Sequence, residues 1–227
     1  QQDKNGFNRS IKIFLKGKPS HLATPKDVVL RLLKEFGAHG LLGYSAEIYG
    51  EYVDSLSLDG RVTIASMATE MGGIIILFSK NDGVQADSDA IYEKTFEIDI
   101  SSLKPLISRP GHPEDVVSVT DVKETKVDSG FIGSCTNGRM EDMRSVAKIL
   151  KNRKIAPGRI LKIVPSTDKI WKKCLDEGLI KIFKHAGALV GSAGCAGCAA
   201  GQIGQTGSGE VAVSSGNRNF VGKQGKG

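Results

Sequence analysis

The sequence predicts an α/β protein made of three-layer α/β/α domains with mainly parallel sheets. Strand-like and helix-like segments alternate through residues 127–220, and this order places helices over a parallel sheet. Of the 227 residues, 40% are hydrophobic and 25% are charged, which is typical of a globular protein. A chain of this length can bury a substantial core.

The first elements expected are a strand and a helix. Residues 10–17, SIKIFLKG, alternate apolar and polar side chains and predict a strand. A helix should follow, with Thr24 as its N-cap, Pro25 at its first position and Gly37 at its end. Its buried stripe is expected to consist of Val28, Val29, Leu32 and Leu33.

The middle of the chain predicts a short buried helix and then a connector. Residues 61–73 predict the helix, and residues 82–129, rich in Gly, Pro and acids, predict a strand, a loop and a connector. We therefore expect one domain over residues 1–126 and a second over residues 127–227. The apolar residues expected to bury the helix are Ile64, Met67, Ala68 and Met71.

In the second half of the chain, predicted strands and predicted helices alternate regularly. Strands are predicted at 126–134, 158–166, 187–192 and 209–216. Helices are predicted within 137–154 and within 167–187, the latter broken near Gly178. The inward face of the first of these helices should carry Met140, Met143, Val146, Ala147 and Leu150.

The charge pattern favours an ordinary protein surface. The formal net charge is +6, but Lys and Arg are interspersed with Asp and Glu, which is typical of solvated helix faces rather than a nucleic-acid-binding stripe. No apolar run is long enough to span a membrane, and the amino terminus does not resemble a leader. Four cysteines are too few for a disulfide scaffold, so we expect the reducing cytoplasm.

Three of the four cysteines lie at positions where ligand binding or catalysis is expected. Cys174 falls in a helical pattern and is predicted to act as a small hydrophobe. Cys135, in FIGSCTNGR, follows a strand at the sheet edge where α/β proteins bind ligands. Cys195 and Cys198 follow another strand, in the small-residue loop GSAGCAGCAAG. A loop so rich in glycine indicates that the backbone approaches something bulky.

Three interpretations of these cysteines remain open from the residues alone. Cys195 and Cys198 could be small residues in a tight turn, or a C-x-x-C redox pair, although no strong helix follows them and Cys135 would be unexplained. A zinc site would need a fourth ligand, and no histidine lies near either segment. Three thiolates suit an iron–sulfur cluster that leaves one iron open.

The blocks GSCTNGR, GCAGC and SGNRNFVGKQG together resemble the aconitase superfamily, in particular the large subunits of its isopropylmalate and homoaconitate branch. The segment EYVDSLSLDGRVTIASMATEMGG is similar to another block of that family. The resemblance runs through nearly the whole chain and corresponds to the carboxyl-terminal half of the large subunit. It implies aconitase-like domains and a [4Fe–4S] cluster held by Cys135, Cys195 and Cys198.

The resemblance also implies roles for other residues. Arg218, with Asn217 in the NRNF block, would grip a substrate carboxylate, and Glu70 would lie near the open iron. Three positions depart from the family pattern: the GCAGC loop lacks a proline, Ser66 replaces an asparagine, and Lys223 replaces a second arginine. Lys223 could still hold a carboxylate as a point charge.

The implied function is a hydro-lyase acting on a small hydroxy di- or tricarboxylic acid, such as the isopropylmalate of leucine biosynthesis. Alternatives are homoaconitase, aconitase or dimethylmalate dehydratase activity, a cluster-sensing RNA-binding protein, and a structural remnant without activity. The family's catalytic serine base belongs to a swivelling domain or small subunit, so we expect such a partner and little activity from this chain alone.

Overall fold

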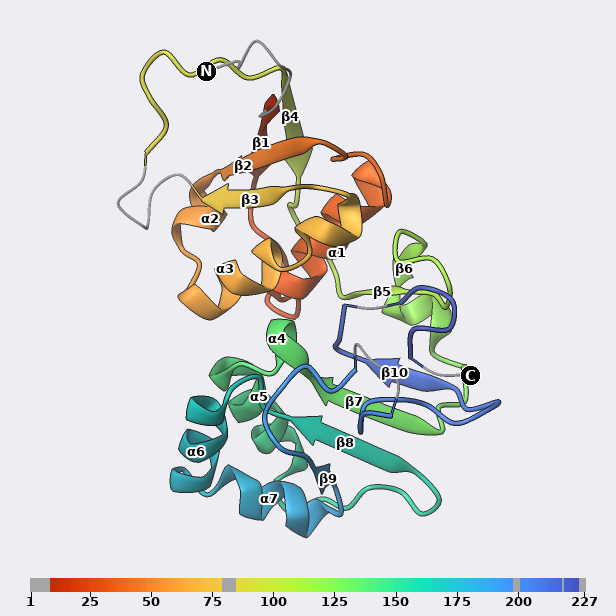
Figure 1. Ribbon diagram of the computed structural model, residues 1–227. Helices are drawn as coiled ribbons and strands as arrows, with labels where there is room; N and C mark the ends of the chain where they lie inside the picture. Colours follow the sequence, from red (N-terminus) through yellow and green to blue (C-terminus); the bar gives the residue numbers. More distant parts are fainter. Residues whose placement is uncertain (1–8, 79–84, 198–200, 218, 225–227) are drawn as a thin grey trace. The chain divides into compact units, whose positions relative to one another are not determined.

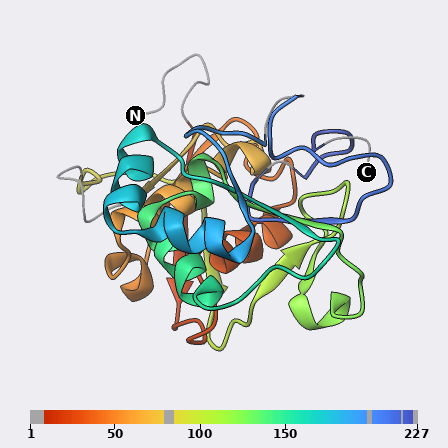
Figure 2. The same ribbon diagram turned by 90° about the horizontal axis from the view of Figure 1, so that it is seen from below.

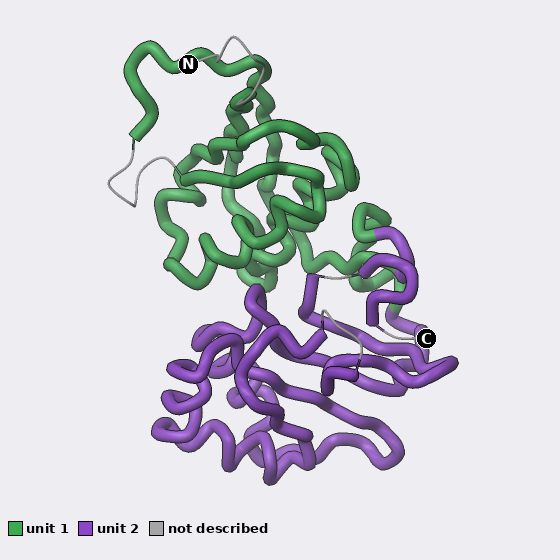
Figure 3. Tube along the Cα trace, in the orientation of Figure 1, with its two compact units in different colours: residues 1–109, 113–122 green, residues 110–112, 123–227 purple. Residues whose placement is uncertain are grey.

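The computed structural model describes residues 9–78, 85–197, 201–217 and 219–224. The chain divides into two compact units, coloured separately in Figure 3. Unit 1 comprises residues 1–109 and 113–122, and unit 2 comprises residues 110–112 and 123–227.

Unit 1 is built on a four-stranded parallel sheet (Figure 1). Its strands, in spatial order, are β3 (Ile75–Phe78), β2 (Tyr44–Tyr49), β1 (Arg9–Lys16) and β4 (Lys94–Asp99). The apolar side chains of one sheet face form a core with helices α1 (Pro25–Phe36) and α3 (Leu58–Ala65). The unit also contains α2 (Glu51–Asp54), η2 (Val119–Val122) and the antiparallel pair β5 (Leu106–Ser108) and β6 (Val116–Ser118).

The first two predicted elements are confirmed. Strand β1 covers the predicted range almost completely, and α1 begins after Thr24 with Pro25 in its first turn and ends at the cap residue Gly37. The four residues of the predicted stripe, Val28, Val29, Leu32 and Leu33, are fully buried. Asp27 closes the start of the helix, because its carboxylate accepts from the backbone N–H and the hydroxyl of Thr24.

The prediction of a single helix over residues 61–73 was wrong in its limits. Helix α3 begins earlier, where the hydroxyl of Ser57 accepts from the Gly60 N–H at 3.0 Å, and it ends at Ala65. A separate 3₁₀ turn, η1 (Ala68–Met71), follows. The apolar residues expected to be inside are buried nonetheless, namely Ile64, Met67, Ala68 and Met71. Burial in the core therefore follows the apolar spacing, whereas capping by Ser57 sets the start of the helix.

Unit 2 has a second parallel sheet, in the order β10 (Ala212–Ser214), β7 (Ser129–Gly133), β8 (Ile160–Val164) and β9 (Leu189–Val190). Helices α5 (Met140–Leu150), α6 (Asp168–Asp176) and α7 (Leu179–Ala186) form a core with one face of this sheet (Figures 1 and 2). The predicted helix break is confirmed at Gly178, which adopts a left-handed conformation. The predicted 137–154 helix is shorter than expected and is preceded by the single turn α4 (Ser134–Asn137).

The opposite face of the unit 2 sheet is covered by the chain that follows β9. Phe131 of β7 and Val164 of β8 form a small buried cluster there with Ala196 and Ile203. The glycine-rich segment therefore lies directly on the sheet. The α/β class and the parallel sheets predicted from the sequence are confirmed. The predicted third layer of helices is not seen in the described part of unit 2, where the chain after β9 covers the second sheet face. Within the described ranges, no helix has the length and apolar character needed to cross a membrane.

Candidate functional site

Cys135 lies at the carboxyl end of β7, on the turn α4 (Figure 1). The strand can turn there because Gly133 has φ 157° and a Cβ at this position would lie 2.5 Å from the Val164 carbonyl oxygen. Ser134 follows with φ 73°, a left-handed conformation that is strained for a serine. This turn leaves the Cys135 side chain exposed while its neighbours Ser134 and Thr136 are buried. The fold thus presents one thiol at the sheet edge.

Cys195 lies in the segment that covers the sheet after β9. The Gly194 N–H donates to the Pro165 carbonyl at 3.1 Å, which fixes this segment at the end of β8. Cys195 is half-buried, and the next residue, Ala196, is buried with φ 57°. Cys198 lies outside the described residues.

The two cysteine segments are attached to consecutive residues at the end of β8. The Gly194 N–H donates to Pro165, as described, and the Ser166 N–H donates to the Gly138 carbonyl at 2.9 Å. Gly138 directly follows the turn that carries Cys135. The structure therefore brings the Cys135 and Cys195 segments to one edge of the parallel sheet, the edge at which α/β proteins bind ligands.

Two glycines beside Cys195, Gly197 and Gly204, are required by this close approach. A Cβ on Gly197 would lie 3.2 Å from the ring of Phe131, and a Cβ on Gly204 would lie 2.5 Å from the Ala196 carbonyl oxygen. Larger side chains would push the segment away from the sheet. Close packing therefore accounts for Gly197 and Gly204, whereas a Cβ on Gly194 or Gly201 would meet nothing within 4 Å.

The carboxyl-terminal residues of the predicted site lie in the same unit. After β10, the Ser215 N–H donates to the Phe131 carbonyl, and the Ser215 hydroxyl accepts from the Gly133 N–H at 3.0 Å. Asn217, two residues later, is half-buried, and Lys223 is exposed. The segment that contains Asn217 is therefore fixed beside the turn that carries Cys135. Arg218 lies outside the described residues.

Ser66 and Glu70 belong to unit 1. Ser66 ends α3, and its hydroxyl donates to the Thr63 carbonyl at 3.2 Å. Glu70 lies on η1 and is only 1% exposed. A carboxyl group so deeply buried is unusual for a surface helix. Ser66 and Glu70 lie in unit 1, whereas Cys135, Cys195 and Asn217 lie in unit 2.

The sheet edge that carries Cys135 and Cys195 offers sulfur donors for a cluster, but Cys195 is disulfide-bonded in this structure and would have to be reduced before it could act as a thiolate ligand. Two buried polar atoms at this edge, Oδ1 of Asn137 and Oγ of Ser166, have no hydrogen-bond partner among the described residues. Such atoms are rare in folded proteins and commonly face a ligand or water. Within the described residues, no three His, Cys, Asp or Glu side chains form a group that could hold a metal ion.

Cys174 provides a contrast with Cys135. It is fully buried in the core of unit 2, with its thiol 3.8 Å from the Met140 sulfur. Burial raises the pKa of the Cys174 thiol to about 11, which makes it a poor nucleophile and metal ligand. Its predicted role as a small hydrophobe is confirmed.

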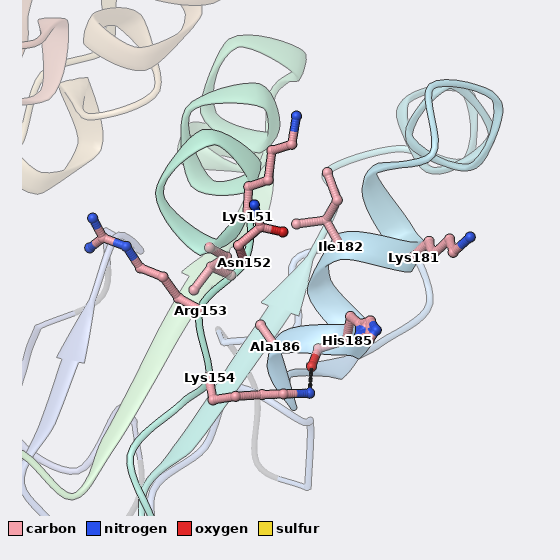
Figure 4. Close-up of a pocket in the computed structure, with 9 residues that line it drawn as sticks. Lys151, Asn152, Arg153, Lys154, Lys181, Ile182, His185 and Ala186 are labelled. Atoms are coloured by element: carbon pink, nitrogen blue, oxygen red, sulfur yellow. Dashed lines mark hydrogen bonds between the residues drawn. The ribbon is translucent and has the colours of Figure 1, made fainter.

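A separate hollow lies at the carboxyl ends of α5 and α7, and it does not contain the predicted site residues. Its lining includes Lys151, Arg153, Lys154 and Lys181, whose charged ends point in different directions (Figure 4). The Lys154 ammonium donates to the His185 carbonyl in the last turn of α7. Cations at helix carboxyl ends complement the helix dipole, which accounts for Lys151 and Lys154, whereas Lys181 lies in the first turn of α7.

Sequence reasoning missed two residues beside the cysteine segments, Lys162 and Gln205. Lys162 interrupts the apolar strand ILKIV and is 9% exposed. A charged residue at a core position of a strand was the available signal. Gln205 lies in a glycine-rich loop, and nothing in the sequence around it indicates a functional role.

Comparison with known proteins places the chain in a family. The model of the aconitase family (aconitate hydratase) matches residues 4–86 and 118–227. The chain is 40% identical over 231 residues to the 3-isopropylmalate dehydratase large subunit of Oleidesulfovibrio alaskensis, covering 95% of this chain and 55% of that protein. It is 41% identical over 214 residues to that of Nitratidesulfovibrio vulgaris, covering 88% and 51%.

A third relative, 3-isopropylmalate dehydratase large subunit 2 of Archaeoglobus fulgidus, is 35% identical and covers 98% of this chain and 58% of that protein. The chain thus spans about half the length of these relatives. Its fold is similar to that of aconitase X from Thermococcus kodakaraensis in the holo-form, with a TM-score of 0.51 and 13% identity over 85% of this chain and 45% of that one. The chain belongs to the aconitase family.

Proposed function

We propose that unit 2 carries part of the active site of a hydro-lyase that removes and re-adds water on a small hydroxy di- or tricarboxylic acid, with 3-isopropylmalate as the first candidate. The observation that carries this proposal is the attachment of the Cys135 and Cys195 segments to Pro165 and Ser166. The names of the relatives support the reaction class and the substrate.

The residues that would hold a [4Fe–4S] cluster are Cys135, Cys195 and Cys198. With three thiolate ligands, such a cluster supplies a Lewis-acidic iron with an open coordination position. The glycines at 197 and 204 keep the backbone close to the sheet face under the loop. The oxygens of Asn137 and Ser166, which have no partner in the described part of the chain, would be available to the occupied site.

Substrate binding is assigned to the chain around Asn217. The guanidinium of Arg218 would bind a substrate carboxylate through two parallel hydrogen bonds, and the Asn217 amide would add a further one. Lys223 would hold a second carboxylate as a compact charge without that paired geometry. These cations would orient the hydroxy acid and exclude uncharged analogues.

In unit 1, Glu70 and Ser66 are proposed to serve the same reaction. The Glu70 carboxyl group, which is 1% exposed, is proposed to act at the reacting site. The Ser66 hydroxyl would contribute a short polar contact where the family pattern has an asparagine.

The carbon-bound proton is proposed to be removed by a residue outside this chain. The relatives are large subunits, so a small subunit is the proposed partner and the source of that base. We place the activity in leucine biosynthesis, in the reducing cytoplasm that a cluster of this kind requires.

Anaerobic reconstitution tests this proposal. The reduced chain, supplied with iron and sulfide, is expected to develop a broad visible absorbance and to retain iron after gel filtration. Cys135→Ser should lose both signals, because its thiolate is one of three ligands. Cys174→Ser is the matched control and should retain both, since Cys174 is buried in the helical core. Equal absorbance and iron content in Cys135→Ser and the wild type would refute the ligand assignment.

A further inference from the structure

A buried lysine lies on the sheet face that the Cys195 segment covers. Lys162 pairs with Phe131 in the register of β7 and β8, so both side chains point to the same face. Lys162 is 9% exposed, and in the described part of the chain its ammonium has one hydrogen-bond partner, the Gln205 carbonyl. An ammonium is costly to bury, so its retention beneath this loop indicates a role there.

Gln205 connects two segments that lie on either side of it. Its side-chain amide donates to the Gly197 carbonyl at 3.1 Å and to the Lys223 carbonyl at 3.2 Å. A primary amide has two N–H donors, so both bonds can form at once. Gly197 belongs to the cysteine segment, and Lys223 belongs to the turn Phe220–Gln224 that follows the NRNF block.

The residues beside Gln205 repeat the same two connections through the backbone. The Gly204 N–H donates to the Ala196 carbonyl at 2.8 Å, and the Thr206 N–H donates to the Gln224 carbonyl at 2.6 Å. Residues 204–206 therefore lie between the cysteine segment and the Phe220–Gln224 turn and are bonded to both. Lys162 fixes the centre of this arrangement to the sheet.

We propose that Lys162 and Gln205 are positioning residues that hold the Cys195 segment and the Phe220–Gln224 turn in a fixed relation. This inference deepens the proposed function, because it assigns to this pair the spacing between the cluster ligands and the residues that bind the substrate carboxylates. The Lys162 ammonium also adds a fixed positive charge beneath a loop on which thiolates and a carboxylate substrate would bring negative charge.

The hydrogen-bonded arrangement is tested first in the reduced, cluster-free chain by amide hydrogen exchange. Gln205→Leu keeps the size of the side chain and removes both donors. We expect exchange at Gly204 and Thr206 to accelerate about tenfold or more, since one hydrogen bond stabilises by about 1 kcal/mol and two are lost. Ser208→Ala, at an exposed position in the same segment, is the control and should leave these amides unchanged. Unchanged exchange in Gln205→Leu would overturn the proposal.

Lys162 is tested by a pair of variants. Lys162→Met keeps an unbranched chain without the charge and should accelerate the same amides by a similar factor. Lys162→Arg retains a donor and a charge and should restore slow exchange. If Lys162→Met and Lys162→Arg give the same amide exchange rates, the ammonium does not hold the loop.

A spectroscopic measurement separates positioning from a general loss of stability. In the reconstituted, reduced protein, Gln205→Leu is expected to change the positions of the electron paramagnetic resonance signals of the cluster when a hydroxy acid is added. A purely structural role would lower the signal amplitude and leave its positions unchanged, and that result would contradict the proposal. If the wild type binds no cluster, the proposed function fails, and the exchange measurements still decide whether Lys162 and Gln205 hold the two segments.

Discussion

Some glycines of unit 2 lie where the backbone passes so close to neighbouring atoms that a side chain would collide with them. At Gly204, a Cβ would lie 2.5 Å from the Ala196 carbonyl oxygen and 3.0 Å from the Phe131 ring. At Gly209, a Cβ would meet nothing within 4 Å, although φ is +73°. The two positions therefore separate the effect of a collision from that of backbone strain.

Gly204→Ala should reduce both stability and iron binding. The collision is expected to destabilise the chain by about 1–3 kcal/mol and to displace the Cys195 segment. Gly209→Ala should destabilise by about 1–2 kcal/mol through its left-handed backbone alone and leave the iron content unchanged. Denaturant unfolding and iron analysis after reconstitution measure the two effects. Equal iron content in both variants would argue against a tight fit of this loop to the sheet.

The buried thiol of Cys174 makes a pH-dependent contribution to stability. Its folded-state pKa is raised to about 11 from an ordinary value of 9.0, so folding favours the neutral thiol. The contribution is complete below pH 9 and is lost as the pH rises through 11. In Cys174→Ala, the fall of the unfolding midpoint between these pH values should be shallower than in the wild type. Parallel curves for the two proteins would show that the thiol does not titrate with folding.

Among the elements, α1 shows how much the sequence determines locally. Its cap residues and buried stripe were predicted from spacing and capping chemistry, and both are confirmed. The carboxylate of Asp27 also accepts from the Leu106 N–H of β5 at 2.7 Å, a contact between residues far apart in the chain. That contact could not be predicted, because the sequence does not indicate which strand end faces a helix start.

Asp27→Ala should destabilise unit 1 substantially. The variant leaves the N–H groups of Thr24 and Leu106 without their acceptor, which is expected to lower the free energy of unfolding by about 2–4 kcal/mol. Glu97→Ala removes an exposed carboxylate that pairs with Lys16, and it should change stability by less than about 1 kcal/mol. Chemical denaturation compares the two. A loss below 1 kcal/mol in Asp27→Ala would show that water replaces the carboxylate in this role.

Elements that were missed or misplaced share a physical cause. Strands β2 and β3 were not predicted, although Gly43 and Gly50 flank β2 and Gly73 lies just before β3. The short apolar run of β3 does not alternate, and such a run does not distinguish a strand from a buried helix segment. The helix over residues 61–73 was predicted from its apolar spacing, but that spacing continues through the break between α3 and η1. Core residues could therefore be predicted more reliably than element limits.

At the candidate site, the sequence predicted the strand-end location of Cys135 and the small-residue loop of Cys195. It could not indicate how the two segments are joined, because the atoms that join them are backbone groups of Gly138, Pro165, Ser166 and Gly194. Backbone hydrogen bonds between loops carry no residue signature. Lys162 was recognisable as an anomaly, whereas its partner became evident only from the fold.

At the scale of the whole molecule, the chain belongs to the aconitase family and spans about half the length of its relatives. Unit 2 contains the proposed cluster ligands and the proposed carboxylate-binding residues, and Glu70 and Ser66 lie in unit 1. The central claim concerns unit 2: the thiols of Cys135, Cys195 and Cys198 act together as one ligand set.

Cysteine alkylation read by mass spectrometry tests that claim most directly in the wild-type chain. In the reduced, cluster-free protein, Cys135, Cys195 and Cys198 should react, and the buried Cys174 should stay unmodified until the chain unfolds. After reconstitution with iron and sulfide, the three thiols should become protected together and in proportion to the bound iron. Continued alkylation of Cys135 at its original rate, with Cys195 and Cys198 protected, would contradict the account.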